Sequence, residues 1–458
     1  MAFHVGLLSY SAWKHSPLVD EPAHLAAGLS HWELQRFDLY RVNPPLVRLT
    51  ASFPLLFVPH ETEWGAYSKN SYRRAEFDVG SDYINANGIS SSRLHFFIAR
   101  LTCIPLSLIG AWFTYRLADE FYGRTSGYLA QILWCFSPWI LSYGSTIMPD
   151  VASASFAAAT FYYFWKWLDR PSWKNAVIAG TVLGLAQLTK FTLIIFIPVI
   201  PLMWVFWRLS GMRKGDPHSL AKHSLQVIAI VSLSLPIINM VYGFEGSFKR
   251  LADYKFVSET LCVESQQKEA PYSTEKINRF QDSPLGSIPI PLPENYVLGI
   301  DVQKFDFEQG RDSYLCGQWR DHGWWYYHLF ALMIKTPTAV LLLGLLSMFL
   351  SLKHMCVNNM EFHKELLLLA PLIAIIVFVS SQTGFSIHSR YIMPSFPFIF
   401  IAISRVGVIV KKSSLMPFIL VLLLALASVL STLAIYPHTF SYFNLLAGGA
   451  KKWRKTST

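Results

Sequence analysis

The sequence predicts an all-α integral membrane protein with about 11 transmembrane helices and two structured exoplasmic loops. Hydrophobic residues make up 52% of the 458 residues, and charged residues only 15%, whereas charged residues make up roughly 25% of a typical soluble domain. The apolar residues also form repeated runs of about 20 residues, which is the length that a helix needs to cross a bilayer. This composition therefore excludes a disordered chain and argues against an ordinary soluble domain.

The candidate spans are mainly apolar runs bounded by charged or turn-forming residues. Residues 1–13 are apolar but too short to cross a bilayer, so they are expected to be the tail of a first span. The other candidate spans lie near residues 95–115, 125–143, 150–167, 174–190, 191–207, 224–243, 328–351, 365–381, 391–410 and 415–436.

Two long polar stretches, residues 14–93 and 244–324, interrupt the apolar runs. The expected organisation is an N-terminal transmembrane bundle over 1–243 that includes the loop 14–93, a large exoplasmic loop over 244–324, and a C-terminal transmembrane bundle with a short tail over 325–458. The short gaps between the apolar runs hold 14 basic against 6 acidic residues, so the positive-inside rule assigns them to the cytoplasm and both long stretches to the opposite side. The formal net charge of +10 therefore does not indicate a nucleic-acid partner.

The first polar stretch begins with the sequence PLVDEPAH, which contains Asp20, Glu21 and His24. Asp20 could be the N-cap of a helix that starts around Pro22. It could also be a general base, because a carboxylate near a helix N-terminus stays ionised and can accept a proton from an acceptor hydroxyl. The two roles are compatible. His24 lies one turn later and could orient Asp20, although a single histidine is more often a packing residue.

The order Asp-Glu-Pro-Ala-His, an aromatic-rich amphipathic helix and Asn43-Pro-Pro-Leu resembles the first exoplasmic loop of the C-type membrane glycosyltransferases. It is most similar to the family of protein O-mannosyltransferases and aminoarabinose transferases (glycosyltransferase family 39-like). The resemblance implies an enzyme that takes a sugar from a polyprenyl-phosphate donor at the exoplasmic face. It identifies Asp20 as the catalytic acid–base residue, with Glu21 beside it. Many relatives have Lys or His at the position of Asn43, so a donor-phosphate contact there is not implied.

Four further charged residues lie at the ends of predicted spans or inside them. Each has a structural reading, as a helix cap or as a side chain that reaches the headgroups. The resemblance favours donor-phosphate contacts for Arg100 and Arg390, because arginine forms paired hydrogen bonds with phosphate. Lys190 could be a third phosphate contact. Asp150 matches a second acidic position of the family, so Glu21 and Asp150 are expected to position groups around the base.

The expected reaction is an inverting transfer of a hexose or pentose to a hydroxyl of a protein, lipid or glycan. A bacterial inner membrane, with the site facing the periplasm or exterior, is the expected location. The alternative function is a secondary transporter or lipid flippase, which would need charged residues deep in several spans and inverted symmetry. A ligase that moves whole glycans from a lipid diphosphate is a second enzymatic alternative.

No cofactor is expected from the sequence. It contains no Walker loop, no GxGxxG and no DxD motif, so neither a nucleotide cofactor nor a metal-bound nucleotide sugar is indicated. The sequence leaves a divalent metal site open, because carboxylate side chains and His24 could lie close together. No spacing of candidate ligands requires such a site. Cys262 and Cys316 both lie in the second polar stretch, so a disulfide between them is allowed.

Overall fold

The computed structural model describes the chain except for residues 70–73, 210–216, 265–275, 356–358, 409–414 and 450–458. The described part is mostly helical, as predicted. Its α-helices are α1 (Ala2–Lys14), α2 (Glu21–Glu33), α3 (Leu46–Ser52), α4 (Gly65–Lys69), α5 (Glu76–Tyr122), α6 (Arg124–Cys135), α7 (Pro138–Tyr143), α8 (Pro149–Asp169), α9 (Trp173–Gln187), α10 (Phe196–Leu209), α11 (Pro217–Val241), α12 (Glu294–Gln309), α13 (Tyr327–Lys335), α14 (Thr338–Met355), α15 (Asn359–Ser380), α16 (Phe396–Ser404) and α18 (Leu415–Leu433).

Short 3-10 helices connect many of these elements. They are η1 (Phe53–Phe57), η2 (Phe191–Ile195), η3 (Leu251–Asp253), η4 (Pro284–Ser287), η5 (Thr383–Phe385), η6 (Ser389–Ser395), η7 (Thr439–Ser441) and η8 (Leu445–Ala447). Two small antiparallel sheets lie in the second polar stretch. Strand β1 (Cys262–Glu264) pairs with β2 (Lys276–Asn278), and β3 (Ser313–Leu315) pairs with β4 (Gln318–Arg320). Cys262 is buried, Cys316 is exposed, and no disulfide joins them.

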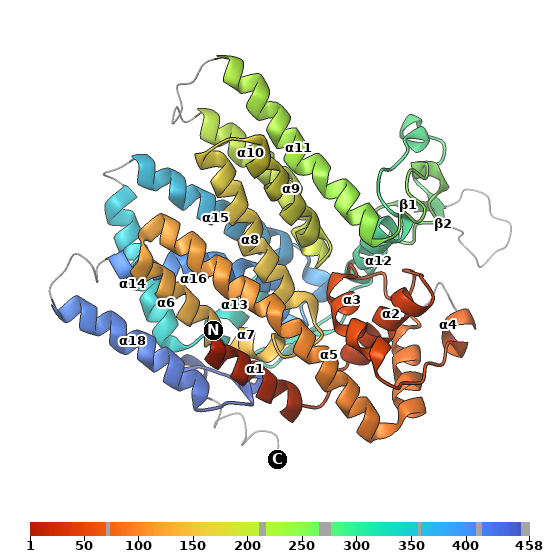
Figure 1. Cartoon of the computed structure of the whole chain (residues 1–458), viewed down its shortest axis with the longest axis horizontal. Helices are drawn as coiled ribbons and strands as arrows, with labels where there is room; N and C mark the ends of the chain where they lie inside the picture. Colours follow the sequence, from red (N-terminus) through yellow and green to blue (C-terminus); the bar gives the residue numbers. More distant parts are fainter. Residues whose placement is uncertain (70–73, 210–216, 265–275, 356–358, 409–414, 450–458) are drawn as a thin grey trace.

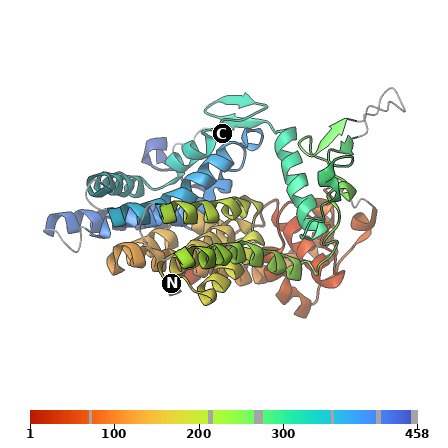
Figure 2. The same ribbon diagram turned by 90° about the horizontal axis from the view of Figure 1, so that it is seen from above.

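The long apolar helices form one bundle, and the elements of the two polar stretches gather at one end of it. Figure 1 shows α2, α3, α4, α12 and the β1–β2 sheet together at that end, and the turned view in Figure 2 agrees. Within the bundle, α9 packs along α11, and α5 packs against both α6 and α8. The polar stretches therefore cover the ends of the helices at which Asp150 and Lys190 lie.

Within the described ranges, four helices are long and apolar enough to cross a membrane: Glu76–Tyr122, Phe191–Leu209, Leu220–Val241 and Leu415–Leu433. A fifth span results if the pair Tyr327–Lys335 and Thr338–Leu352, bent by 112°, is counted as one. The predicted number of about 11 spans is therefore not confirmed.

Breaks and shorter helices account for much of this difference in number. The predicted span 125–143 is two helices, α6 and α7, because the chain leaves the helical conformation at Ser137 before Pro138. The predicted span 174–190 corresponds to α9, which has only 15 residues, fewer than a bilayer-spanning helix needs. The predicted span 391–410 begins as the 3-10 helix η6 before α16.

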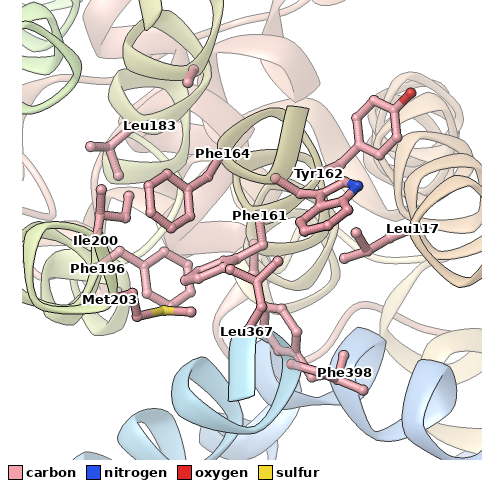
Figure 3. Close-up of a cluster of buried hydrophobic side chains, with 14 of the residues drawn as sticks. Leu117, Phe161, Tyr162, Phe164, Leu183, Phe196, Ile200, Met203, Leu367 and Phe398 are labelled. Carbon is pink, nitrogen blue, oxygen red and sulfur yellow. The ribbon is translucent and has the colours of Figure 1, made fainter. Parts of the chain in front are cut away.

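Nine of the 28 residues of the largest buried cluster are aromatic, and the cluster joins α5, α8, α9, α10, α15 and α16 (Figure 3). Phe161 lies at its centre and is fully buried. Its ring meets those of Phe196 and Phe398 edge to face, with centroids 4.9 Å and 5.2 Å away, a favoured geometry for aromatic pairs. This cluster fixes α8, and with it Asp150 at the start of that helix.

Replacing Phe161 with alanine should leave a cavity at the centre of this cluster and lower the free energy of unfolding by about 3–5 kcal/mol. The matched control is Phe418→Ala on α18, because the Phe418 ring is 39% exposed. The measurement is the thermal unfolding midpoint of the purified protein in detergent. Equal shifts for the two variants would contradict the packing described here.

Candidate active site

A polar cavity of about 690 Å³ opens between the first polar stretch, the start of α8, the turn before η2 and the start of η6. This volume is in the range of small-molecule binding sites. The lining residues are Leu18, Val19, Asp20, Tyr40, Val42, Asn43, Arg74, Phe77, Tyr143, Met148, Pro149, Asp150, Lys190, Gln303, Asp306, Arg311, Ile387, His388, Arg390, Tyr391 and Phe440. Four residues predicted for the site, Asp20, Asp150, Lys190 and Arg390, are thus brought together.

Asp20 lies directly before α2, but its side chain does not cap that helix. Its Oδ2 instead accepts a hydrogen bond of 2.6 Å from Nη2 of Arg390. Within the described ranges, no hydrogen bond reaches the other carboxylate oxygen, and the side chain is 19% exposed to the cavity side. Asp20 therefore keeps one oxygen available to a molecule in the cavity.

Asp150 lies in the first turn of α8 and is almost completely buried. Its Oδ1 accepts a hydrogen bond of 2.5 Å from Nζ of Lys190. Its Oδ2 is 3.6 Å from Nε of Arg390. The ammonium of Lys190 also lies 4.3 Å from the centre of the Tyr391 ring, a cation–π arrangement. Arg390 thus bridges both carboxylates, and Lys190 pairs with the deeper one.

The two carboxylates, Asp20 and Asp150, balance the charges of the two cations, Lys190 and Arg390. Burial alone would lower the pKa of Arg390, but the carboxylates of Asp150 and Asp20 outweigh burial and raise that pKa above its ordinary value. Arg390 therefore stays a cation. His388 also lines the cavity, and its pKa is lowered to about 4 by burial and then by Arg390. His388 is therefore neutral near pH 7.

Glu21 and Arg100 are not part of this cavity. They form a buried pair in which Arg100 Nε and Nη2 donate to the two carboxylate oxygens of Glu21 over 2.9 Å and 2.6 Å. Arg100 also donates to the carbonyls of Ala12, His15 and Ser16, so all five of its donors are used within the protein. The pair joins α5 to the start of α2.

His24 does not contact the Asp20 carboxylate in the structure. Its ring packs on the ring of Tyr40 with centroids 4.5 Å apart. Its Nε2 is buried and, in the described part of the chain, has no hydrogen-bond partner. Burial, and then the nearby cations headed by Arg48, lowers the pKa of His24 well below its usual value. The ring is therefore neutral and acts in packing.

Several cavity residues were not identified from the sequence. Tyr40 has a φ of +59°, which is uncommon for a residue with a side chain, and buried Arg48 donates to its carbonyl and to that of Asn43. Gln303 and Asp306 come from α12. The only available signal was their place in a polar stretch, and a pairing over more than 200 residues cannot be read from spacing.

A second, apolar cavity of about 370 Å³ adjoins the polar one. The two share Lys190, Gln303 and Tyr391 in their linings. The apolar cavity is a groove lined mainly by residues of η2, α12 and α15 with neighbouring residues: Phe191, Thr192, Ile194, Thr260, Leu261, Ile300, Lys304, Phe307, His328, Phe378, Val379 and Gln382. An apolar chain in this groove would have its end beside Lys190.

No group of three or more His, Cys, Asp or Glu side chains in the described ranges is arranged to hold a metal ion. Asp20 and Asp150 are each paired with a cation instead. The arrangement can therefore present a carboxylate oxygen and two cationic side chains to a single molecule.

The Glu21–Arg100 pair generates a stability prediction. Glu21→Gln leaves the buried guanidinium of Arg100 without its counter-charge, so we expect the free energy of unfolding to fall by about 3–5 kcal/mol. The matched control is Glu294→Gln, because the Lys249–Glu294 pair is about 30% exposed and such pairs contribute at most about 1 kcal/mol. Thermal unfolding in detergent measures both. Similar small losses for the two variants would contradict the described role of the pair.

Comparison with known protein families gives one match. The model of the dolichyl-phosphate-mannose-protein mannosyltransferase family matches residues 90–237, which is about a third of the chain. This segment begins within α5, ends within α11 and includes Asp150 and Lys190. No curated relative matches the chain.

Solved structures show the same fold at low sequence identity. The chain is similar to ArnT from Cupriavidus metallidurans bound to undecaprenyl phosphate, with 14% identity, a TM-score of 0.52, and coverage of 91% of this chain and 60% of ArnT. The apo oligosaccharyltransferase of Archaeoglobus fulgidus has 14% identity, a TM-score of 0.54, and coverage of 96% and 56%. The complex of AglB from the same organism with an inhibitory peptide and a dolichol-phosphate has 13% identity, a TM-score of 0.53, and coverage of 94% and 55%.

The chain thus spans less than two thirds of the length of these solved structures. The agreement extends over nearly all of this chain, and it is an agreement of fold. Together with the family match, it confirms the resemblance to the C-type membrane glycosyltransferases that the sequence predicts.

Proposed function

We propose that the protein transfers a sugar from a polyprenyl-phosphate donor to an acceptor hydroxyl at the exoplasmic face of a membrane. One observation carries the proposal: the polar cavity that holds Asp20, Asp150, Lys190 and Arg390 adjoins an apolar groove. A polyprenyl-phosphate sugar has the same order of parts, an apolar chain, an anionic phosphate and a polar sugar. The lipids bound in ArnT and AglB, undecaprenyl phosphate and a dolichol-phosphate, are of this chemical class.

The isoprenoid chain would lie in the groove, and the phosphate would lie beside Lys190 and Arg390. Lys190 is suited to this role because it lines both cavities. Arg390 reaches the same point from the start of η6. Two cations in a buried site can offset the charge that develops on a departing phosphate, and they do so more strongly than in water.

Asp20 would be the general base. The acceptor hydroxyl gives its proton to the carboxylate of Asp20 while its oxygen attacks the anomeric carbon of the donor sugar. The bond between that carbon and the phosphate oxygen breaks, and the electron pair leaves with polyprenyl phosphate. A single displacement of this kind inverts the anomeric configuration. Asp150 would hold Lys190 and Arg390 in place, since it contacts both.

The proposal also includes the side of the membrane that the cavity faces and the kind of membrane. The cavity faces away from the cytoplasm in the topology favoured by the distribution of basic residues. The proposal does not depend on whether the chain has the 11 predicted spans or the four or five apolar spans found in the described residues. It requires only that the groove opens to the outer leaflet. A bacterial inner membrane, with the site facing the periplasm, is the setting that we propose.

The amide substitution Asp20→Asn should abolish the base and leave the cations that would bind the donor. We expect turnover to fall by about 100- to 10,000-fold, while the affinity for polyprenyl phosphate changes by less than about threefold. The matched control is Asp78→Asn, because Asp78 is exposed on α5 and does not line the cavity. Turnover is measured by mass spectrometry of glycosylated acceptor, and turnover that survives in Asp20→Asn would reject the assigned base.

The substitution Lys190→Gln tests the phosphate site. Charge-assisted hydrogen bonds contribute about 1.5–3 kcal/mol, so we expect the affinity for polyprenyl phosphate to fall by about 10- to 100-fold. Lys174→Gln is the control, since Lys174 is exposed at the opposite end of α9. Equilibrium binding to the purified protein in detergent provides the measurement. Unchanged affinity in Lys190→Gln would remove the phosphate from this position.

A further inference from the structure

The β3–β4 hairpin of the second polar stretch exposes a pair of aromatic side chains. Tyr314 pairs with Trp319 across the two strands, and their ring centroids lie 5.1 Å apart. The two residues are 51% and 70% exposed. None of the seven residues from 313 to 319, which form the tip of the hairpin, is charged. Exposed aromatic rings that gather in this way are typical of an interaction surface.

The base of the hairpin is fixed at the rim of the apolar groove. The backbone N–H groups of Arg311 and Gly323 donate to the carbonyls of Gly384 and Thr383 over 2.8 Å and 2.9 Å. Thr383 directly follows Gln382, which lines the groove. A two-stranded hairpin by itself is at best marginally stable in water, so the part beyond this base gains stability from a partner.

The hairpin lies to the side of the helical bundle. Figure 2 shows the β3–β4 sheet, in blue-green, displaced sideways from the bundle, whereas the β1–β2 sheet lies at the end where the first polar stretch gathers. The helices of the bundle cross a membrane lengthwise, so a sideways displacement runs along the membrane plane. The hairpin therefore projects over the surrounding lipid rather than into the water beyond it.

The helix that follows the hairpin runs along the same boundary. A bend of 112° separates α13 from α14 in the pair counted as one candidate span, so α13 runs close to the plane of a bilayer that α14 crosses. Trp325 and Tyr326, directly before α13, are exposed. Leu445 and Leu446 are also exposed, and Asn444 beside them donates hydrogen bonds to carbonyls at the end of α13. Apolar and aromatic side chains that flank such a helix are typical of the membrane interface.

We infer that the β3–β4 hairpin inserts its uncharged tip into the outer-leaflet interface of the membrane, beside the apolar groove. Trp and Tyr favour this region, because their rings are apolar while the indole N–H and the phenol O–H reach water and headgroups. The charged residues lie next to the base of the hairpin, where they stay in contact with headgroups and water: Arg311, Asp312, Arg320 and Asp321. The inserted tip holds the rim of the groove at the depth of the lipids. The inference goes beyond the proposed transfer reaction and does not require it.

Cys316 at the tip of the hairpin provides a probe for this insertion. It is exposed, whereas the other free cysteines of the described residues are buried, and Cys356, which lies outside those residues, is replaced by serine in every sample. A nitroxide spin label on Cys316 is measured by electron paramagnetic resonance with the full-length protein in phosphatidylcholine nanodiscs. Oxygen concentrates in the bilayer, and a water-soluble nickel chelate is excluded from it. We expect the label to collide more with oxygen and less with the nickel chelate than a label on a water-exposed control.

The matched control is a label on Ser81→Cys in a chain that also carries Cys316→Ser, because Ser81 is exposed on a polar part of α5. Removing the aromatic pair by Tyr314→Ala and Trp319→Ala should shift the Cys316 label toward the values of this control. Both aromatic residues are exposed, so the variant keeps the fold.

The inference is overturned if the labels on Cys316 and Ser81→Cys have equal accessibility to the two reagents, or if loss of the aromatic pair changes nothing. A Cys316 label that is in water, and that becomes less accessible to the nickel chelate when a soluble glycan is added, would also overturn it and assign the aromatic rings to glycan binding. Turnover is not part of the measurement, so failure of the proposed function is a separate outcome.

Discussion

The guanidinium of Arg390 between the carboxylates of Asp20 and Asp150 is the interaction on which the site depends. It joins three segments separated by at least 130 residues: the start of α2, the start of α8 and the start of η6. Charges at such a depth are stable only when they are paired. The pairing therefore fixes where these segments can meet, and it leaves a polar cavity where the loops join the helical bundle.

Two further sets of polar contacts hold the walls of that cavity in position. The Glu21–Arg100 pair ties the first polar stretch to α5, so the residue beside Asp20 anchors the backbone from which Asp20 projects. On the other side, Arg41–Asn295 and Arg74–Asp306 contacts hold α12 over the cavity and the groove. The second polar stretch thus covers the cavity and the groove. Ile300 and Phe307 of α12 line the groove, Asp306 lines the cavity, and Gln303 lines both. In the proposed function, this arrangement would separate a lipid chain from its headgroup.

The sequence was sufficient for the helical class and for a cluster of charges at one end of the helical bundle, because apolar runs and charged residues at their ends are local features. It could not show that Asp20 and Glu21 face different partners. Consecutive helical residues point about 100° apart, and which direction faces the cavity depends on α1 and α5. Gln303 and Asp306 were missed for a related reason, since their place in the lining of the cavity depends on long-range packing. The predicted number of spans is not confirmed, because turns such as the one at Ser137 break an apolar run that looks continuous in the sequence.

The most direct test of the account is an experimental structure of the full-length protein with polyprenyl phosphate bound. The account predicts that the phosphate lies within hydrogen-bonding distance of Lys190 and Arg390 and that the isoprenoid chain runs along Phe307 in the groove. Density for the phosphate beside the buried Glu21–Arg100 pair, or for the lipid on a face remote from Asp20, would contradict it.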